Sequence, residues 1–137
     1  MLLTECNLHA QAEGILLTFT GNGLDLDFMN QMDVYSLFGN AVSNAVEAVT
    51  LVEDPEKKLV DIVVERRGNL VNISINNYFN GEIRMVDGLP ETTKQEEAGF
   101  HGFGMKSMRL LAEKYGGGIS VKVQGDLFSL GVYLFSK

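Results

Sequence analysis

The sequence predicts a single domain of the α/β class, in which amphipathic helices pack against a β-sheet. Two stretches, 33–49 and 105–115, repeat apolar residues at helical spacing. Two pairs of strand-like segments are each joined by a short turn, which is typical of hairpins. The chain has 137 residues, long enough for one hydrophobic core. We therefore expect residues 1–137 to form one domain.

Composition narrows the function classes. The formal net charge of −7 argues against general affinity for nucleic acid or acidic lipid. An acidic chain can bind a polyanion through a local pocket, usually one built from backbone amides and a metal ion. The single cysteine, Cys6, excludes an internal disulfide and a cysteine-based zinc site. No apolar run reaches the roughly 18–20 residues of a membrane span, so we expect a cytoplasmic domain without direct membrane contact.

The first quarter of the chain predicts short elements. Residues 1–14 read as a weakly helical lead-in, and 15–20 as a strand. Gly21-Asn22-Gly23 is a turn signal, and 24–28 is a second short strand candidate.

The helix predicted at 33–49 carries amides beside its apolar face. Asp33 is a suitable N-cap. The apolar face comprises Val34, Leu37, Phe38, Ala41, Ala45, Ala48 and Val52. Asn40, Asn44 and Glu47 line up on its flank, which fits either a solvated helix edge or a ligand site.

A charged loop with a helix-stopping proline, 53–58, precedes a hairpin of strands 59–67 and 70–77. Gly68-Asn69 is its two-residue turn. Val71, Ile73 and Ile75 alternate onto one face of the second strand, and Asn77 continues that inward row. A polar residue there either caps the sheet or contacts a ligand.

Periodicity disappears over 78–103, and so long a segment favours a functional lid. It ends in a glycine-rich stretch that opens the helix predicted at 105–115, whose apolar face comprises Met105, Met108, Leu111, Ala112 and Tyr115. Gly116-Gly117-Gly118 stops this helix. Strands at 119–123 and 127–135 close the chain as a hairpin.

A glycine-rich segment that opens a helix suits phosphate, because unpaired backbone N–H groups and the positive end of the helix dipole meet there. The spacing alone also fits ordinary turns. Lys106 and Arg109 lie in the first turns of the helix and add positive charge or are simply solvated. The Asn-bearing helix offers amide oxygens of the kind that suits Mg²⁺ together with substrate phosphates.

Three motifs together resemble a known family. Residues 40–45, Asn-Ala-Val-Ser-Asn-Ala, resemble the N-box, and 102–105, Gly-Phe-Gly-Met, resemble the G2 box of the GHKL superfamily of ATPases. The similarity is close to the GHKL sensor histidine kinases of Gram-positive bacteria, in which DxYSLFGNAxxNAxEA, DGLPxTTK and HGFGMKSxRxxxEKYGG recur in this order. The resemblance implies a Bergerat-type α/β sandwich: a mixed, mainly antiparallel sheet covered on one face by helices, with ATP beneath a lid.

Carried over to this sequence, the resemblance implies specific roles. Asn44 would coordinate Mg²⁺ that bridges the ATP phosphates, and Asn40 would lie beside the phosphates and their water. Lys106 would contact phosphate. The remaining nucleotide-binding positions would be Lys94 and His101 in the lid, and Gly102, Phe103, Gly104 and Met105 at the phosphates.

The adenine-binding position differs from the wider family, which has an Asp-x-Gly-x-Gly box after the central strand. Here the strand ends Asn76-Asn77-Tyr78, and the strand phase puts Asn77 at the aspartate position. An amide oxygen also accepts from the adenine amino group, but a neutral bond contributes about 0.5–1.5 kcal/mol against about 1.5–3 for a charged one.

The resemblance implies phosphoryl transfer rather than hydrolysis. Hydrolytic members have a glutamate at the first N-box position, whereas Asn40 cannot act as a general base. We expect slow hydrolysis and transfer of the γ-phosphoryl group to a histidine on a separate dimerisation helix, with a response regulator downstream. Two alternatives stay open: a serine kinase of the anti-sigma-factor type, and a degenerate nucleotide-binding or protein-interaction module without kinase activity.

Overall fold

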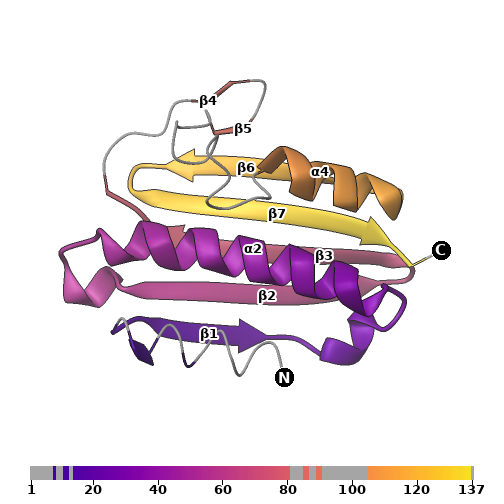
Figure 1. The fold of residues 1–137 in the computed structure, drawn as a ribbon, viewed down its shortest axis with the longest axis horizontal. Coiled ribbons are helices and arrows are strands. Elements are labelled where there is room, and N and C mark those ends of the chain that lie inside the picture. The colour runs from indigo at the N-terminus through magenta and orange to yellow at the C-terminus, as the bar shows by residue number, and fades with distance from the viewer. Residues whose placement is uncertain are drawn as a thin grey trace.

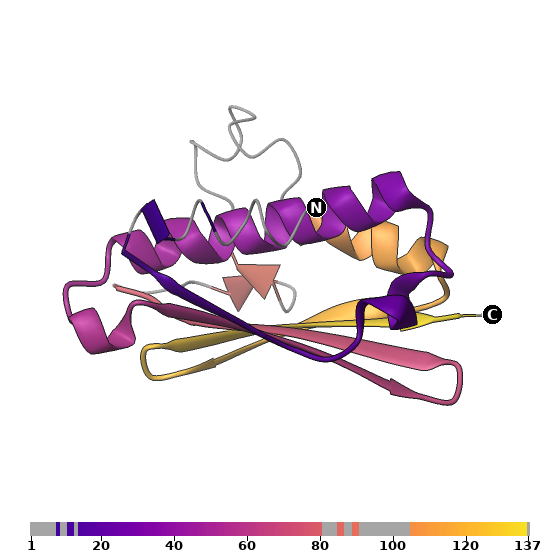
Figure 2. The ribbon, with the colours of Figure 1, turned by 90° about the horizontal axis from the view of Figure 1, so that it is seen from below.

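The described part of the protein is built in two layers, a five-stranded sheet and two long helices that lie on one of its faces (Figures 1 and 2). The computed structural model describes residues 8, 11, 12, 14–80, 85, 86, 89, 90 and 105–136. Within them the principal helices are α2, Gln31–Thr50, and α4, Met105–Lys114. Figure 2 shows both helices on the same side of the sheet.

The sheet has the strand order β1-β2-β3-β7-β6. Its strands are β1 Leu16–Thr20, β2 Leu59–Arg67, β3 Leu70–Tyr78, β6 Gly118–Gln124 and β7 Leu127–Phe135. β1 and β2 pair in parallel, as a crossover through α2 requires, and the other pairs are antiparallel. The predicted two-layer sandwich with a mixed, mainly antiparallel sheet is confirmed. A separate two-stranded piece consists of β4, Met85–Val86, and β5, Leu89–Pro90.

The β2–β3 hairpin has the predicted turn. Gly68 adopts φ +63° at the turn, a left-handed conformation that glycine reaches without steric cost. Val71, Ile73 and Ile75 of β3 are at most 1% exposed, so their predicted inward row is confirmed. Asn77 follows in the same row and is 3% exposed.

Helix α2 begins earlier than the sequence suggested. Asn30 has extended backbone angles, and its side chain accepts a hydrogen bond from the Met32 N–H at 2.8 Å. Asn30 is therefore the N-cap, and the prediction of Asp33 as the cap is wrong. Asp33 lies within the first turn and bonds the end of α4 instead. A carboxylate in the first turn still interacts favourably with the positive end of the helix dipole.

The buried stripe of α2 is wider than predicted. Val42, Val46 and Val49 are buried together with Leu37, Phe38, Ala41 and Ala45, whereas Val34 and Ala48 are only partly buried. The helix lies over the middle of the sheet (Figure 1) and packs on both β2 and β3, so a wider part of its surface is buried.

Two short 3₁₀ helices precede longer elements: η1, Gly23–Leu26, and η2, Pro55–Lys57. The strand predicted at 24–28 is wrong, because the Asn22 side chain caps η1 by accepting from the Leu24 N–H at 2.9 Å. That local bond favours a helical turn over an extended strand. No helix of the described residues has both the length and the apolar character of a membrane span.

Helix α4 buries Met108, Leu111 and Ala112, as predicted, with Met105 and Tyr115 packed partly against the core. The glycines that follow α4 are required for different structural reasons. Gly116 takes φ +76°, while a Cβ on Gly117 would lie 1.7 Å from the Tyr133 carbonyl oxygen. The second glycine therefore permits close packing of the chain on β7.

Candidate functional site

The flank of α2 presents two amides, Asn40 and Asn44, at the border of its buried stripe. Both side chains are partly buried. The Asn40 Nδ2 donates to the Ser36 carbonyl at 2.6 Å, one turn earlier on the same helix. This bond holds the Asn40 amide with its nitrogen toward the backbone, which leaves the oxygen as the group that can accept from or coordinate a ligand.

Among the described residues, Asn77 is a polar side chain that is buried in the core, with 3% exposure. Its Nδ2 donates to the Tyr78 carbonyl at 2.9 Å. Burial of an amide costs free energy unless it is hydrogen-bonded, and this bond supplies part of that compensation. The amide is thereby oriented with its oxygen available as an acceptor.

Asn44 lies in the carboxyl-terminal half of α2, and Asn77 lies next to the carboxyl end of β3. α2 packs directly on β3, and its carboxyl-terminal half lies over the end of β3 that carries Asn77 (Figure 1). Just beyond these ends, the Asn80 Nδ2 donates to the Leu51 carbonyl at 3.4 Å. The structure therefore brings Asn44 and Asn77 to the same half of the domain.

Helix α4 runs antiparallel to α2 (Figure 1), and its first turn carries Met105, which is partly buried, and Lys106, which is exposed. Lys114 and Tyr115 bond to Asp33 at the opposite end. At 1.5 Å per residue, Lys106 lies about 14 Å along α4 from Tyr115, while Asn40 and Asn44 lie about 10 and 16 Å along α2 from Asp33. Lys106 thus comes level with the two amides.

Five of the residues assigned by resemblance lie outside the described residues: Lys94, His101, Gly102, Phe103 and Gly104. The same holds for most of the segment 78–103 that was expected to form a lid.

The donor set can be compared with what Mg²⁺ requires. In residues 14–80 and 105–136 there is no cluster of three or more His, Cys, Asp or Glu side chains. Mg²⁺ bound with a nucleotide typically takes one or two protein oxygens, with substrate phosphates and water filling its other positions. The partly buried Asn44 amide fits that need.

The sequence did not point to a network at the other end of the helices. The Tyr115 hydroxyl donates to the Asp33 Oδ2 at 2.5 Å, and the Lys114 Nζ lies 2.8 Å from the same oxygen. Hydrogen bonds first from Lys114 and then from Tyr115 hold the pKa of Asp33 below its ordinary value. Desolvation, followed by the bond to Asp33, raises the pKa of Tyr115. The sequence did contain one indication of this network, because Asp33 and the pair Lys114-Tyr115 both belong to motifs that recur in the kinases that the sequence resembles.

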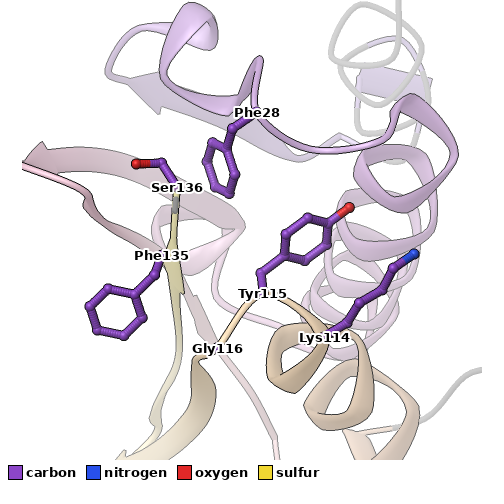
Figure 3. A pocket seen from close by; sticks show the side chains of 6 residues that line it. All are labelled: Phe28, Lys114, Tyr115, Gly116, Phe135 and Ser136. Carbon is purple, nitrogen blue, oxygen red and sulfur yellow. The ribbon is translucent and has the colours of Figure 1, made fainter.

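A hollow of about 530 Å³ lies beside this network (Figure 3). It is lined by Phe28, Lys114, Tyr115, Gly116, Phe135 and Ser136. It is thus at the carboxyl end of α4, whereas the α2 amides are level with the beginning of that helix. The hollow is not the place where the sequence predicts nucleotide.

Comparisons with known proteins agree with this architecture. A family model described as a GHKL domain matches residues 29–134. The structure is similar to a nucleotide-free catalytic domain of the histidine kinase ThkA, with a TM-score of 0.69, 18% identity, and coverage of 98% of this chain and 90% of that one.

Two further structures share the fold. The histidine kinase AdeS of Acinetobacter baumannii aligns with a TM-score of 0.64 and 9% identity, over 99% of this chain and 64% of that one. ThkA in complex with the response regulator protein TrrA aligns with a TM-score of 0.62 and 18% identity, over 99% and 40%. No match was found among curated protein sequences.

Proposed function

This chain belongs to the GHKL domain family, and we propose that it is the catalytic domain of a two-component sensor histidine kinase, which binds Mg-ATP and donates the γ-phosphoryl group to a histidine on a separate dimerisation helix. The observation that carries the proposal is the placement of three amides. Asn40 and Asn44 lie on the flank of α2, and Asn77 ends the row beneath it. The proposal assigns ATP to the space that these residues border.

Asn77 would recognise the adenine. Its Nδ2 is committed to the Tyr78 carbonyl, so the amide presents its oxygen, which can accept from the adenine amino group. The position is buried, and a hydrogen bond contributes more there than in water. A neutral acceptor gives weaker recognition than a carboxylate, about 0.5–1.5 kcal/mol net.

Asn44 would hold the magnesium ion, and Lys106 the phosphates. A bound magnesium ion would supply neutralisation of the charge that develops during phosphoryl transfer. The Lys106 ammonium, in the first turn of α4, adds charge where the dipole of that helix is positive. The chain's own residues therefore position the triphosphate and neutralise its charge.

Asn40 favours transfer over hydrolysis. An amide has no basic lone pair at neutral pH and cannot take a proton from water, and the Nδ2 of Asn40 is bound to the Ser36 carbonyl. The acceptor must therefore arrive with its own nucleophile, as a histidine imidazole does.

Partners and location belong to the same proposal. The complex of ThkA with TrrA supports a response regulator as the downstream partner of the kinase that contains this domain. The order of the three motifs supports the Gram-positive branch of sensor kinases, and the domain would act in the cytoplasm.

Calorimetric titration tests the proposal directly. The wild-type domain is titrated with ATP and with a non-hydrolysable analogue, each with and without magnesium. We expect magnesium-dependent binding that Asn44→Ala abolishes. Ser43→Ala, an exposed neighbour on the same helix, is the matched control and should bind as the wild type does.

The outcomes separate the candidate functions. Absence of binding at millimolar nucleotide would refute the kinase proposal. It would favour a degenerate interaction module, which is the candidate that the uncharged Asn77 suggests. Binding that Asn44→Ala leaves unchanged would remove the magnesium role from this residue.

A further inference from the structure

We propose that Asp33 and Tyr115 are positioning residues, which set the place of the first turn of α4 relative to the amides of α2. The inference rests on the proposed function, because it concerns the distance between the two groups assigned to the phosphates. Neither residue lies at those groups. Both lie toward the opposite end of the helix pair, about 10–16 Å away along the helices.

Tyr115 joins three elements at one point. Its backbone carbonyl accepts from the Phe135 N–H at 2.9 Å, which ties it to the end of β7. Its hydroxyl donates to Asp33 and accepts from the Asn30 N–H at 3.0 Å, which ties it to the start of α2. The sheet and both helices therefore share a junction at this residue.

The ring of Tyr115 is also held in place. The Phe28 ring meets it edge to face, with centroids 5.8 Å apart and an interplanar angle of 86°. Figure 3 shows the Tyr115 hydroxyl and the Lys114 ammonium directed toward the α2 side of the hollow. Asp33, whose side chain is only 16% exposed, accepts from both.

Directional bonds matter here because the buried face of α4 is apolar. Met108, Leu111 and Ala112 bury α4 on the core, and the hydrophobic effect is non-directional, so it resists separation more than sliding or rotation. Hydrogen bonds weaken steeply when their angles change. The polar junction therefore sets the angle of α4 more sharply than its buried face does.

The geometry converts a small tilt into a displacement at the site. If the junction lets α4 tilt by about 10°, Lys106, about 14 Å along the helix, moves by about 2.5 Å. A misplacement of about 1 Å is enough to impair a site that depends on positioning. A small change of angle at the junction therefore produces the largest displacement at the first turn of α4.

The test removes the hydroxyl and keeps the ring. Tyr115→Phe retains the edge contact with Phe28 but loses the bonds to Asp33 and Asn30. Tyr35→Phe is the matched control, because Tyr35 is a half-exposed tyrosine on α2, two residues from Asp33. Asp33→Asn is a second variant, which weakens the same junction from the α2 side.

Helix position is measured with spin labels and needs no nucleotide. Cysteines are introduced by Ser43→Cys on α2 and Lys106→Cys on α4, both at exposed positions, in a Cys6→Ser background. Pulsed electron–electron double resonance then gives the distribution of distances between the two spin labels. We expect Tyr115→Phe and Asp33→Asn to shift or broaden it by about 2 Å or more, and Tyr35→Phe to leave it unchanged.

Binding and stability are measured on the unlabelled proteins. We expect Tyr115→Phe to remain folded at the assay temperature and to bind Mg-ATP about fivefold or more weakly. A distance distribution like that of the wild type overturns the inference. So does a shifted distribution with unchanged Mg-ATP affinity, since the junction would then be structural only. If the wild type itself binds no Mg-ATP, the proposed function fails, and the spin-label distances alone decide whether the junction sets the helix position.

Discussion

Replacing Asn77 by aspartate introduces the residue that the resemblance to the wider family implies for this position, and the structure predicts that the nucleotide-free domain becomes less stable. The side chain is 3% exposed, and its Nδ2 donates to the Tyr78 carbonyl at 2.9 Å. A carboxylate has no N–H to donate, so Asn77→Asp loses this bond and buries a charge facing a carbonyl oxygen. The two effects together cost about 2–4 kcal/mol, or about 6–15 °C in melting temperature for a domain of this size.

Thermal denaturation at pH 7.5 and pH 5 is the assay, with Asn76→Asp as the control. Asn76 is the neighbouring amide on the opposite face of β3 and is only partly buried. Burial raises the pKa of a carboxyl above its unfolded value. The unfolded state then binds fewer protons between the two values, and stability falls as the pH rises. The Asn77→Asp deficit should therefore shrink at pH 5, where a protonated carboxyl can donate to the carbonyl. Equal melting temperatures of the two variants at pH 7.5 would refute the reasoning.

The same variant should bind ATP more tightly. A charged acceptor exceeds a neutral one by about 1–1.5 kcal/mol, which corresponds to an affinity about 5–12 times higher. Inosine triphosphate lacks the amino group that donates this bond, so the gain should be absent with it. An equal gain for both nucleotides would contradict the assignment of Asn77 to the adenine.

Two further predictions concern stability. Gly117→Ala should destabilise the domain by more than about 2 kcal/mol, because the new Cβ would lie 1.7 Å from the Tyr133 carbonyl oxygen, whereas Gly23→Ala meets nothing within 4 Å; equal urea midpoints would contradict this. The pKa of Asp33 is lowered chiefly by the hydrogen bond from Lys114, so its contribution to stability is fully present above the unfolded pKa and is lost as the pH falls through the folded value, below about pH 4. Urea denaturation should therefore show a difference in stability between Asp33→Asn and wild type at pH 7 that shrinks as the pH falls below about 4. A difference that stays constant over this range would count against the junction.

Local patterns predicted the β3 row and its turn correctly. Strand side chains alternate with a period of two, so once Val71, Ile73 and Ile75 are inward, Asn77 must be inward too. The Gly68 turn followed from the conformational freedom of glycine. These properties depend on residues a few positions apart and need no tertiary information.

The start of α2 shows where local reasoning fails. Asn30 and Asp33 both have side chains that suit an N-cap, and composition does not choose between them. The choice is made by Lys114 and Tyr115, which lie more than 80 positions further along the chain and bond the Asp33 carboxylate. The error at 24–28 has a local cause instead, since the capping bond of Asn22 was available in the sequence.

By itself, the sequence determined the class of fold, the inward row that ends at Asn77, the amides on the flank of α2 and the resemblance to GHKL kinases, because periodicity and motif order are properties of the chain. Only the tertiary structure decided which end of α2 meets the end of β3 and that Tyr115 joins the two helices to the sheet. The physical reason is that a hydrogen bond between distant residues depends on how the core packs, and packing is a property of all elements together.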